Sequence, residues 1–228
     1  MAYAVRKRGD GKGEMEPDLI WMRPGKAGVG RPATRSRTEI TEAAVRVADR
    51  DGLAGVSMRN VAAELGTAAG SLYRYVENRD DLLDLMADHV AAEYDLPAPT
   101  GDWRADLVTM GLQAREIHRR HPWLAELTLT RPVVGPNGIE VTEHFLAVLA
   151  DHPARDGDKL VALAMLTTVV AATAHSEASP VDALRSTRYL AHVAAQGRHP
   201  HLAALDVRPA EGDLFPATLE RILSGLLG

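Results

Sequence analysis

The chain has 228 residues, 46% of them hydrophobic and none of them cysteine, a length that suits one medium domain or a small domain joined to a larger one. The lack of cysteine excludes disulfides, thiolate zinc sites and cysteine nucleophiles. The sequence has no run of about 18 apolar residues and no signal-like apolar stretch near its start, so we expect a cytoplasmic protein with no membrane partner.

Charge is distributed unevenly along the chain, whose net charge is −5. Residues 1–37 carry nine Lys or Arg against four acidic residues, which leaves a net charge of −10 on residues 38–228. A basic arm on an acidic body can bind phosphate locally, because salt screens charges beyond about 8–10 Å. The arm therefore has two open interpretations, a DNA contact or a solvated tail.

Residues 1–33 are rich in Gly, Pro and charge, a composition typical of disorder, and we expect a disordered basic arm there. Leu19 to Met22 form an apolar island, "LIWM", within this arm. We expect the island to dock on the body of the protein or on a partner.

Three short helices are predicted after the arm. Apolar residues recur at helical spacing before Gly52, which is expected to end the first helix. Ser57 is a good N-cap for the second helix, and Gly66 suits a sharp turn because glycine adopts positive φ at little cost. The three predicted helices cover residues 38–51, 58–65 and 69–75.

The remaining sequence is also predicted to be helical. Asn78 can cap the helix that follows it, and the helix over 158–175 is apolar nearly all round, which indicates burial or an interface. No strand pattern is present, so the predicted fold class is all-α with about nine or ten helices. The further predicted helices cover residues 79–94, 102–121, 122–130, 135–152, 158–175, 180–196 and 214–228.

The second and third helices, joined by a turn that contains Gly66, have the arrangement of a helix-turn-helix motif. In such a motif the later helix, here the one predicted over 69–75, lies in the major groove with its N-terminal residues at the base edges. The small residues Ala68 to Ser71 would let the backbone come close to DNA. Close approach is one reason to accept Gly70 within a helix, where it costs about 0.5–1 kcal/mol relative to Ala.

Polar side chains at the two helices point to phosphate binding. Tyr73, Arg74 and Tyr75 present one charge and two hydroxyls, and Arg59 lies where it can reach the flanking phosphate backbone. The alternative is a helical hairpin inside a larger bundle, in which Tyr73 and Tyr75 are half-buried packing residues.

The stretch from Thr38 to Met86 resembles the DNA-binding domain of TetR-type transcriptional repressors. The resemblance rests on "AAVRVADRDGLAGVSMRNVAAELGTAAGSLYRYVENRDDLLDLM", about a fifth of the chain. It implies a core containing Val61, Leu65, Leu72 and Val76. It also implies DNA contact by Met58, Arg59, Thr67, Ala68, Ala69, Gly70, Ser71, Tyr73, Tyr75 and Arg79, with Arg74 as a further phosphate contact.

The remainder resembles the ligand-binding and dimerisation half of the tetracycline-repressor branch. Trp103 at the start of a helix and "LTLTRP" before a loop carry this resemblance. Leu127 stands where the tetracycline repressor has a histidine that helps bind the drug's magnesium. We therefore expect an effector other than the tetracycline–magnesium complex.

Other chemistry is less well supported by the sequence. Nine histidines are present, and His118 and His121 lie three apart on one helix, but no HExxH motif or matching carboxylate spacing completes a metal site. We expect surface or capping histidines there and no metal. No Gly-x-Ser-x-Gly motif or P-loop is present, and no cofactor is expected.

A ligand pocket is expected in the helical body, since pockets are mostly apolar with a few polar groups. For each candidate residue, simple filling of the core is an equally open alternative. The candidate pocket residues are Met110, Ala114, Trp123, Leu127, Arg131, His144, Phe145, Met165 and Thr168.

These observations favour a homodimeric regulator, a repressor that a small-molecule effector releases from a palindrome-like double-stranded DNA operator. We expect a DNA-binding domain at 34–80 and an effector-binding and dimerisation domain at 81–228, with the helices 158–175 and 214–227 forming a four-helix interface. Two alternatives stay open: an all-α enzyme or carrier that uses the cavity without reading DNA, and an architectural helical protein without a ligand.

Overall fold

The computed structural model describes residues 19–23, 35–131, 134–178, 180–205 and 212–228. These residues contain eleven helices and no strand, which confirms the all-α prediction. The helices are α1 (Arg37–Gly55), α2 (Met58–Glu64), α3 (Ala69–Leu72), α4 (Arg79–Ala91), α5 (Trp103–Arg120), α6 (Trp123–Thr130), α7 (Pro136–Val148), α8 (Asp156–Ala178), α9 (Pro180–Ala195), α10 (Pro200–Ala203) and α11 (Phe215–Leu227).

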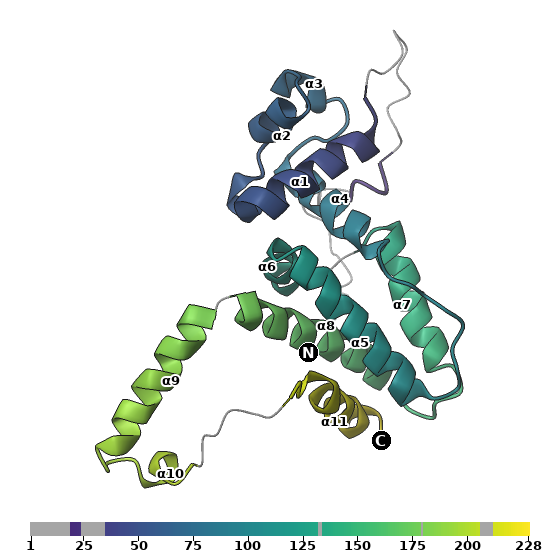
Figure 1. The fold of residues 1–228 in the computed structure, drawn as a ribbon. Coiled ribbons are helices and arrows are strands. Elements are labelled where there is room, and N and C mark those ends of the chain that lie inside the picture. Colours follow the sequence, from purple (N-terminus) through teal and green to yellow (C-terminus); the bar gives the residue numbers. More distant parts are fainter. Residues whose placement is uncertain (1–18, 24–34, 132–133, 179, 206–211) are drawn as a thin grey trace, which may run out of the picture.

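Helices α1, α2 and α3 form a small unit at one end of the molecule, joined to the rest by α4 (Figure 1). Helix α1 packs against both α2 and α4, and α2 packs against α3. Apolar side chains from all four helices close one core, in which Ile40, Val61, Leu72 and Leu82 are completely buried. The small helices are therefore held rigidly around α1 and α4.

The predicted helix boundaries are largely set by local capping. Ser57 accepts a hydrogen bond from the Asn60 amide and Asn78 accepts one from the Asp81 amide, as expected of N-caps. Helix α1 is assigned through Gly55, but Gly52 has φ 70° and ψ 178°, so the regular helix breaks where the sequence predicted. Helix α3 ends at Leu72 rather than at residue 75, because the chain tightens into a turn in which the Tyr75 amide donates to the Leu72 carbonyl.

The larger body is built on α5 and α8, which pack against each other and against α11. A second core lies between them and includes Leu107, Phe145, Leu166 and Leu219. A Cβ added at Gly111 on α5 would lie 2.2 Å from Leu219 Cδ2. Glycine at this position therefore lets α11 approach α5 closely.

Arg115 joins three segments of the body. Its guanidinium donates to Glu177 on α8 and to Asp213 just before α11, and its Nε lies 3.0 Å from Glu177 Oε1. These hydrogen bonds from Arg115 hold the pKa of both carboxyl groups below the ordinary range. The network fixes the end of α8 and the start of α11 onto α5.

Residues 19–23 show the docking expected of the apolar island: Ile20 is only 2% exposed within the first core, and Arg23 donates to Asp81 of α4. The rest of the arm lies outside the described residues. Helix α8 is long and apolar enough to span a membrane by length and composition, with a mean hydropathy of 1.4, although no such run was expected; in the fold it packs against α5, α6 and α11.

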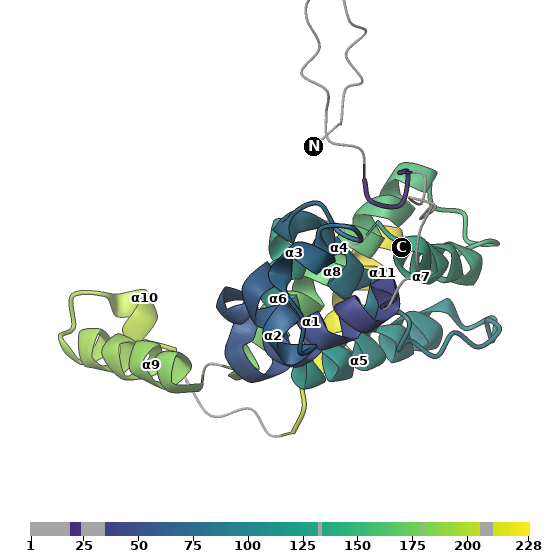
Figure 2. The same ribbon diagram turned by 90° about the horizontal axis from the view of Figure 1, so that it is seen from above.

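Helices α9 and α10 lie apart from the body in both views (Figures 1 and 2). The sequence predicted α9 but missed α10, a single turn. Tyr189 and Leu190 on α9 are 68% and 51% exposed. On α8, Leu160, Val161 and Met165 are also exposed. Helices α8 and α9 thus carry apolar side chains that the described residues do not bury.

Candidate DNA interface and ligand cavity

The turn between α2 and α3 has the geometry that the sequence predicted. Gly66 has φ 64°, and its amide and that of Thr67 donate to Ala63 and Ala62 carbonyls at the end of α2. The positive φ favours glycine because a side chain is strained in that conformation. The turn brings α3 directly against α2.

Three predicted DNA-binding side chains point to solvent at this end of the molecule. Tyr73 is 51% exposed, and Arg59 and Arg74 are exposed. Within the described part of the chain, no hydrogen bond or ion pair occupies either arginine. Both guanidinium groups are therefore available to bind phosphate, to which a guanidinium can donate two parallel hydrogen bonds.

Other predicted contact residues are used inside the motif. Met58 is 8% exposed in the first core, and Tyr75 is half-buried against it. The Thr67 and Ser71 hydroxyls lie 3.1 Å apart, and Ser71 also donates to Ala68. Arg79 donates to the Val56 and Leu53 carbonyls at 2.9 and 2.8 Å, which fixes α4 to the end of α1.

Two predicted contact residues, Ala68 and Gly70, are exposed, and Ala69 is half-buried at the start of α3. A Cβ added at Gly70 would meet no atom within 4 Å, and its φ is not positive. The fold itself therefore does not require glycine at position 70.

The substitution Gly70→Ala is expected to raise the free energy of unfolding by about 0.5–1 kcal/mol, because alanine loses less conformational freedom in a helix. The same change is expected to lower DNA affinity, since the added methyl group stands where the backbone approaches the groove. Urea unfolding and fluorescence anisotropy on a labelled duplex measure the two effects. Equal or tighter DNA binding by the variant would contradict close approach at this position.

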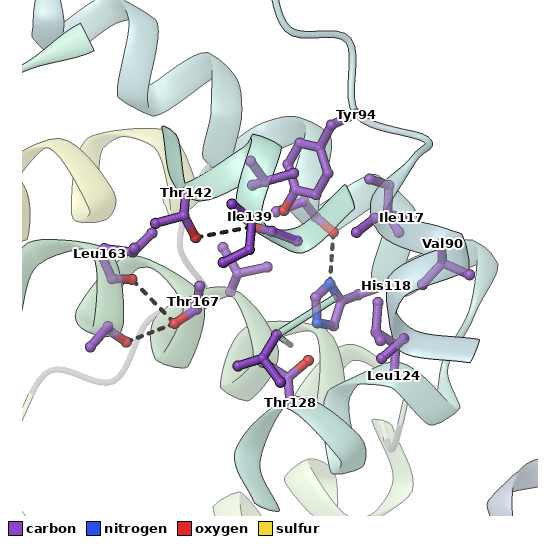
Figure 3. A pocket seen from close by; sticks show the side chains of 18 of the residues that line it. Val90, Tyr94, Ile117, His118, Leu124, Thr128, Ile139, Thr142, Leu163 and Thr167 are labelled. Carbon is purple, nitrogen blue, oxygen red and sulfur yellow. Dashed lines mark hydrogen bonds between the residues drawn. The ribbon is translucent and has the colours of Figure 1, made fainter. Parts of the chain in front are cut away.

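A cavity of about 390 Å³ lies in the helical body, within the size range of pockets for small molecules. Its wall is formed by α4, α5, α6, α7 and α8, and most of its lining is aliphatic (Figure 3). The polar side chains in the wall come from Tyr94, His118, Thr128, Arg131, Thr142 and Thr167.

Of the pocket residues predicted from the sequence, Ala114 and Arg131 line this cavity. Trp123, Leu127 and Phe145 are instead buried in the two cores, because their large apolar side chains fill the space between helices. Met165 and Thr168 lie on the outward face of α8. Met110 and His144 line a separate hollow of only about 30 Å³.

Arg131 lies at the cavity wall just after α6. It donates to Asp80 at 2.8 Å and to Asp84 at 2.9 Å, both on α4. Burial opposes its charge, but the hydrogen bonds to the two carboxylates outweigh that effect and raise its pKa. The charge of Arg131 is therefore already balanced by α4, the helix that joins α1, α2 and α3 to the body.

The sequence predicted surface or capping histidines here: His121 is the C-cap of α5, whereas His118 lies within the helix, and the two are only 8% and 6% exposed. Burial lowers the pKa of His118, and the nearby His121 lowers it further. Burial also raises the pKa of Tyr94, so its hydroxyl stays protonated. Among the described residues, no three His, Asp or Glu side chains gather as a metal site.

His121 connects the body to the DNA-binding unit. Its Nδ1 lies 2.7 Å from Asp49 Oδ1 on α1, and its Nε2 lies 2.9 Å from Glu93 Oε1 after α4. Trp123 Nε1 donates to the same Asp49 oxygen at 2.7 Å. Ionised carboxylates only accept, so both ring nitrogens donate only when the imidazole carries two protons. We call Asp49, Glu93, His121 and Trp123 the junction cluster.

Sequence reasoning missed both His118 as a cavity residue and the junction cluster. A signal for His118 was present, because it follows Ala114 by four residues and continues the apolar stripe of α5. No local pattern marks Asp49, which meets its partners across more than 70 residues of sequence.

Comparison with known proteins agrees with both parts of the fold. Residues 40–86 match the family profile described as "Bacterial regulatory proteins, tetR family", and residues 96–228 match "Tetracyclin repressor-like, C-terminal domain". The chain is 37% identical over 225 residues to the HTH-type transcriptional repressor DrrR1 of Streptomyces coeruleorubidus, covering 92% of this chain and 83% of that protein.

Solved structures give the same result. ActR from Streptomyces coelicolor, a TetR family protein crystallised with (S)-DNPA, superposes with a TM-score of 0.75 at 33% identity, covering 85% of this chain and 97% of that one. Its complex with actinorhodin gives a TM-score of 0.73 at 32% identity, with the same coverage. Fold, motif and relatives together define a helix-turn-helix transcriptional regulator. The chain belongs to the TetR family.

Proposed function

We propose that this regulator is a repressor that binds a palindrome-like DNA operator as a homodimer and leaves it when a small molecule enters the cavity. The observation that carries the proposal is the presence of two exposed arginines, unpaired among the described residues, Arg59 on α2 and Arg74 just after α3, in a chain whose body holds a largely apolar cavity. Residues 34–80 act as the DNA-binding domain and residues 81–228 as the effector-binding and dimerisation domain. A cytoplasmic location follows from this role.

DNA binding is assigned to the side chains that the fold leaves exposed. Arg59, Tyr73 and Arg74 contact phosphates, while Ala68 and Gly70 allow the start of α3 to approach the major groove. Met58 supports this surface from the core, and the exposed Arg79 supports it through hydrogen bonds to the Leu53 and Val56 carbonyls. Some of the predicted residues thus contact DNA, and others hold the contacting residues in place.

Dimerisation is assigned to the outward face of α8 together with α11. Val161 and Met165 are exposed on α8, and Leu226 is 36% exposed on α11. Exposed apolar side chains grouped on one face indicate a protein interface. A two-fold axis there must bring the two α3 helices about 34–36 Å apart, so that they reach successive major grooves.

Effector binding acts through α4, which contributes to both the cavity and the DNA-binding core. Ala87, Val90 and Ala91 of α4 line the cavity, while Leu82 and Met86 of the same helix lie in the first core. A ligand that displaces α4 favours a dimer whose α3 helices no longer match the spacing of the two operator half-sites. This shift requires the ligand to bind that conformation more tightly than the DNA-binding conformation. ActR was crystallised with (S)-DNPA and with actinorhodin, and these two compounds are the first effector candidates for this cavity.

The test is anisotropy of a labelled operator duplex titrated with the protein, with and without actinorhodin as the first effector probe. A coupling of about 1–3 kcal/mol predicts a 5- to 150-fold loss of DNA affinity when the effector is bound. The proposed release would be contradicted if an effector is shown to occupy the cavity and the affinity for the duplex does not change.

A further inference from the structure

The His118 side chain carries a hydrogen-bonding atom that the protein does not satisfy. Its Nδ1 lies 2.8 Å from the Ala114 carbonyl oxygen, one turn earlier on α5. A carbonyl only accepts hydrogen bonds, so Nδ1 is the protonated nitrogen. In the neutral ring Nε2 is then an acceptor, and this atom is buried without a partner among the described residues.

The neutral form of His118 is the one that burial favours. The side chain is 6% exposed, and its pKa is lowered by its burial. A buried acceptor without a donor is destabilising and rarely left empty in a native protein. Since His118 lines the cavity (Figure 3), a molecule in the cavity is positioned to supply the missing donor.

Two threonines that face His118 across the cavity also offer acceptors, whereas the Tyr94 and Thr128 hydroxyls in the same wall keep a hydrogen to donate. The Thr142 hydroxyl donates to the Gly138 carbonyl at 3.0 Å, and the Thr167 hydroxyl donates to the Ala164 carbonyl at 2.9 Å (Figure 3). Each hydroxyl hydrogen is therefore used within its own helix, and the oxygen can only accept from a ligand.

Charge in the lining gives no reason to expect an ionic ligand. Arg131 is paired with Asp80 and Asp84, and Tyr94 stays protonated because burial raises its pKa. The rest of the described lining consists of aliphatic side chains and threonines. A neutral, largely apolar molecule with a hydroxyl donor matches this wall.

We propose that His118 is the specificity-determining residue of the cavity, and that its Nε2 accepts a hydrogen bond from a hydroxyl group on a neutral ring system such as a phenol. This inference rests on the proposed function of the cavity as the effector site. It adds the class of ligand and the atom that selects it.

The probes are 2-naphthol and 2-methoxynaphthalene, which share a ring system but differ in the hydrogen-bond donor. Isothermal titration of the full chain is expected to show 2-naphthol binding about 10- to 100-fold more tightly, because the ether leaves Nε2 without a partner. In His118→Phe this preference is expected to fall to about one. In His118→Gln part of it should return, since the amide oxygen can accept.

The matched control is His89→Phe on α4, a histidine that does not line the cavity, and it should keep the wild-type preference. Circular dichroism establishes that each variant is folded. If His118→Phe does not fold, the wild-type preference and the ¹⁵N signal of His118 Nε2, which should shift upfield on adding 2-naphthol, still decide the question.

Equal binding of the two probes to the wild type would overturn the inference and leave the cavity as an effector site. An unchanged preference in His118→Phe would overturn it as well. Failure of both probes to bind would overturn both the inference and the cavity's role, whereas DNA binding, measured separately by anisotropy, would stand or fall independently.

Discussion

Replacing both Arg59 and Tyr73 with alanine is expected to lower operator affinity by about 100-fold or more while the chain stays folded. A hydrogen bond to a charged group contributes about 1.5–3 kcal/mol and a neutral one about 1 kcal/mol, and a dimer loses both contacts twice. Both side chains are exposed, so their removal leaves no gap in the core. Anisotropy on a selected duplex gives the affinity, and circular dichroism monitors the fold.

The salt dependence separates phosphate contacts from other losses. Loss of the Arg59 phosphate contact should reduce the slope of log affinity against log salt concentration by about one for each chain of the dimer. Arg155→Ala is the control, because Arg155 is an exposed arginine on the body whose one ion pair within the described part of the chain is the local one with Asp158. Wild-type affinity in the double variant would show that α2 and α3 do not form the DNA-reading surface.

The substitution Asp49→Ala is expected to lower the free energy of unfolding by about 1–3 kcal/mol. One oxygen of Asp49 accepts from Trp123 and faces His121, and its loss leaves the buried Trp123 N–H without an acceptor. Because the junction cluster holds α1 against the body, DNA affinity should fall as well. Urea unfolding measures the first effect and anisotropy the second.

Asp51→Ala is the matched control for this change. Asp51 lies two residues further along α1, is exposed and, among the described residues, pairs only with the neighbouring Arg50, so its loss should cost under about 0.5 kcal/mol. Equal stability of the Asp49 and Asp51 variants would mean that the junction cluster does not contribute to holding the two parts together.

Local sequence predicted the helix-turn-helix unit well, because its features depend on nearest neighbours. The break at Gly52, the caps at Ser57 and Asn78, and the turn at Gly66 all follow from backbone preferences of single residues. Helix α3 was predicted too long, since tightening of its last turn depends on packing around Leu72 rather than on propensity.

The cavity was much harder to predict from sequence. Apolar residues on a helix have the same periodicity whether they fill a core or line a hollow, and so Trp123, Leu127 and Phe145 could not be told from Ala114. Whether such a residue fills a core or lines the cavity depends on how α4, α5, α6, α7 and α8 pack together. The role of Arg131 depends likewise on carboxylates of α4 that lie more than 40 residues away in sequence.

The central claim is that this chain reads a specific DNA sequence through α2 and α3. The most direct measurement is selection of binding sites from a random-sequence duplex library, followed by anisotropy on the selected duplex and a scrambled one at two salt concentrations. We predict a palindrome-like site bound at least 10³-fold more tightly than the scrambled duplex, with both affinities falling steeply with salt. Equal, weak binding of both duplexes, removed by competitor DNA, would contradict the claim.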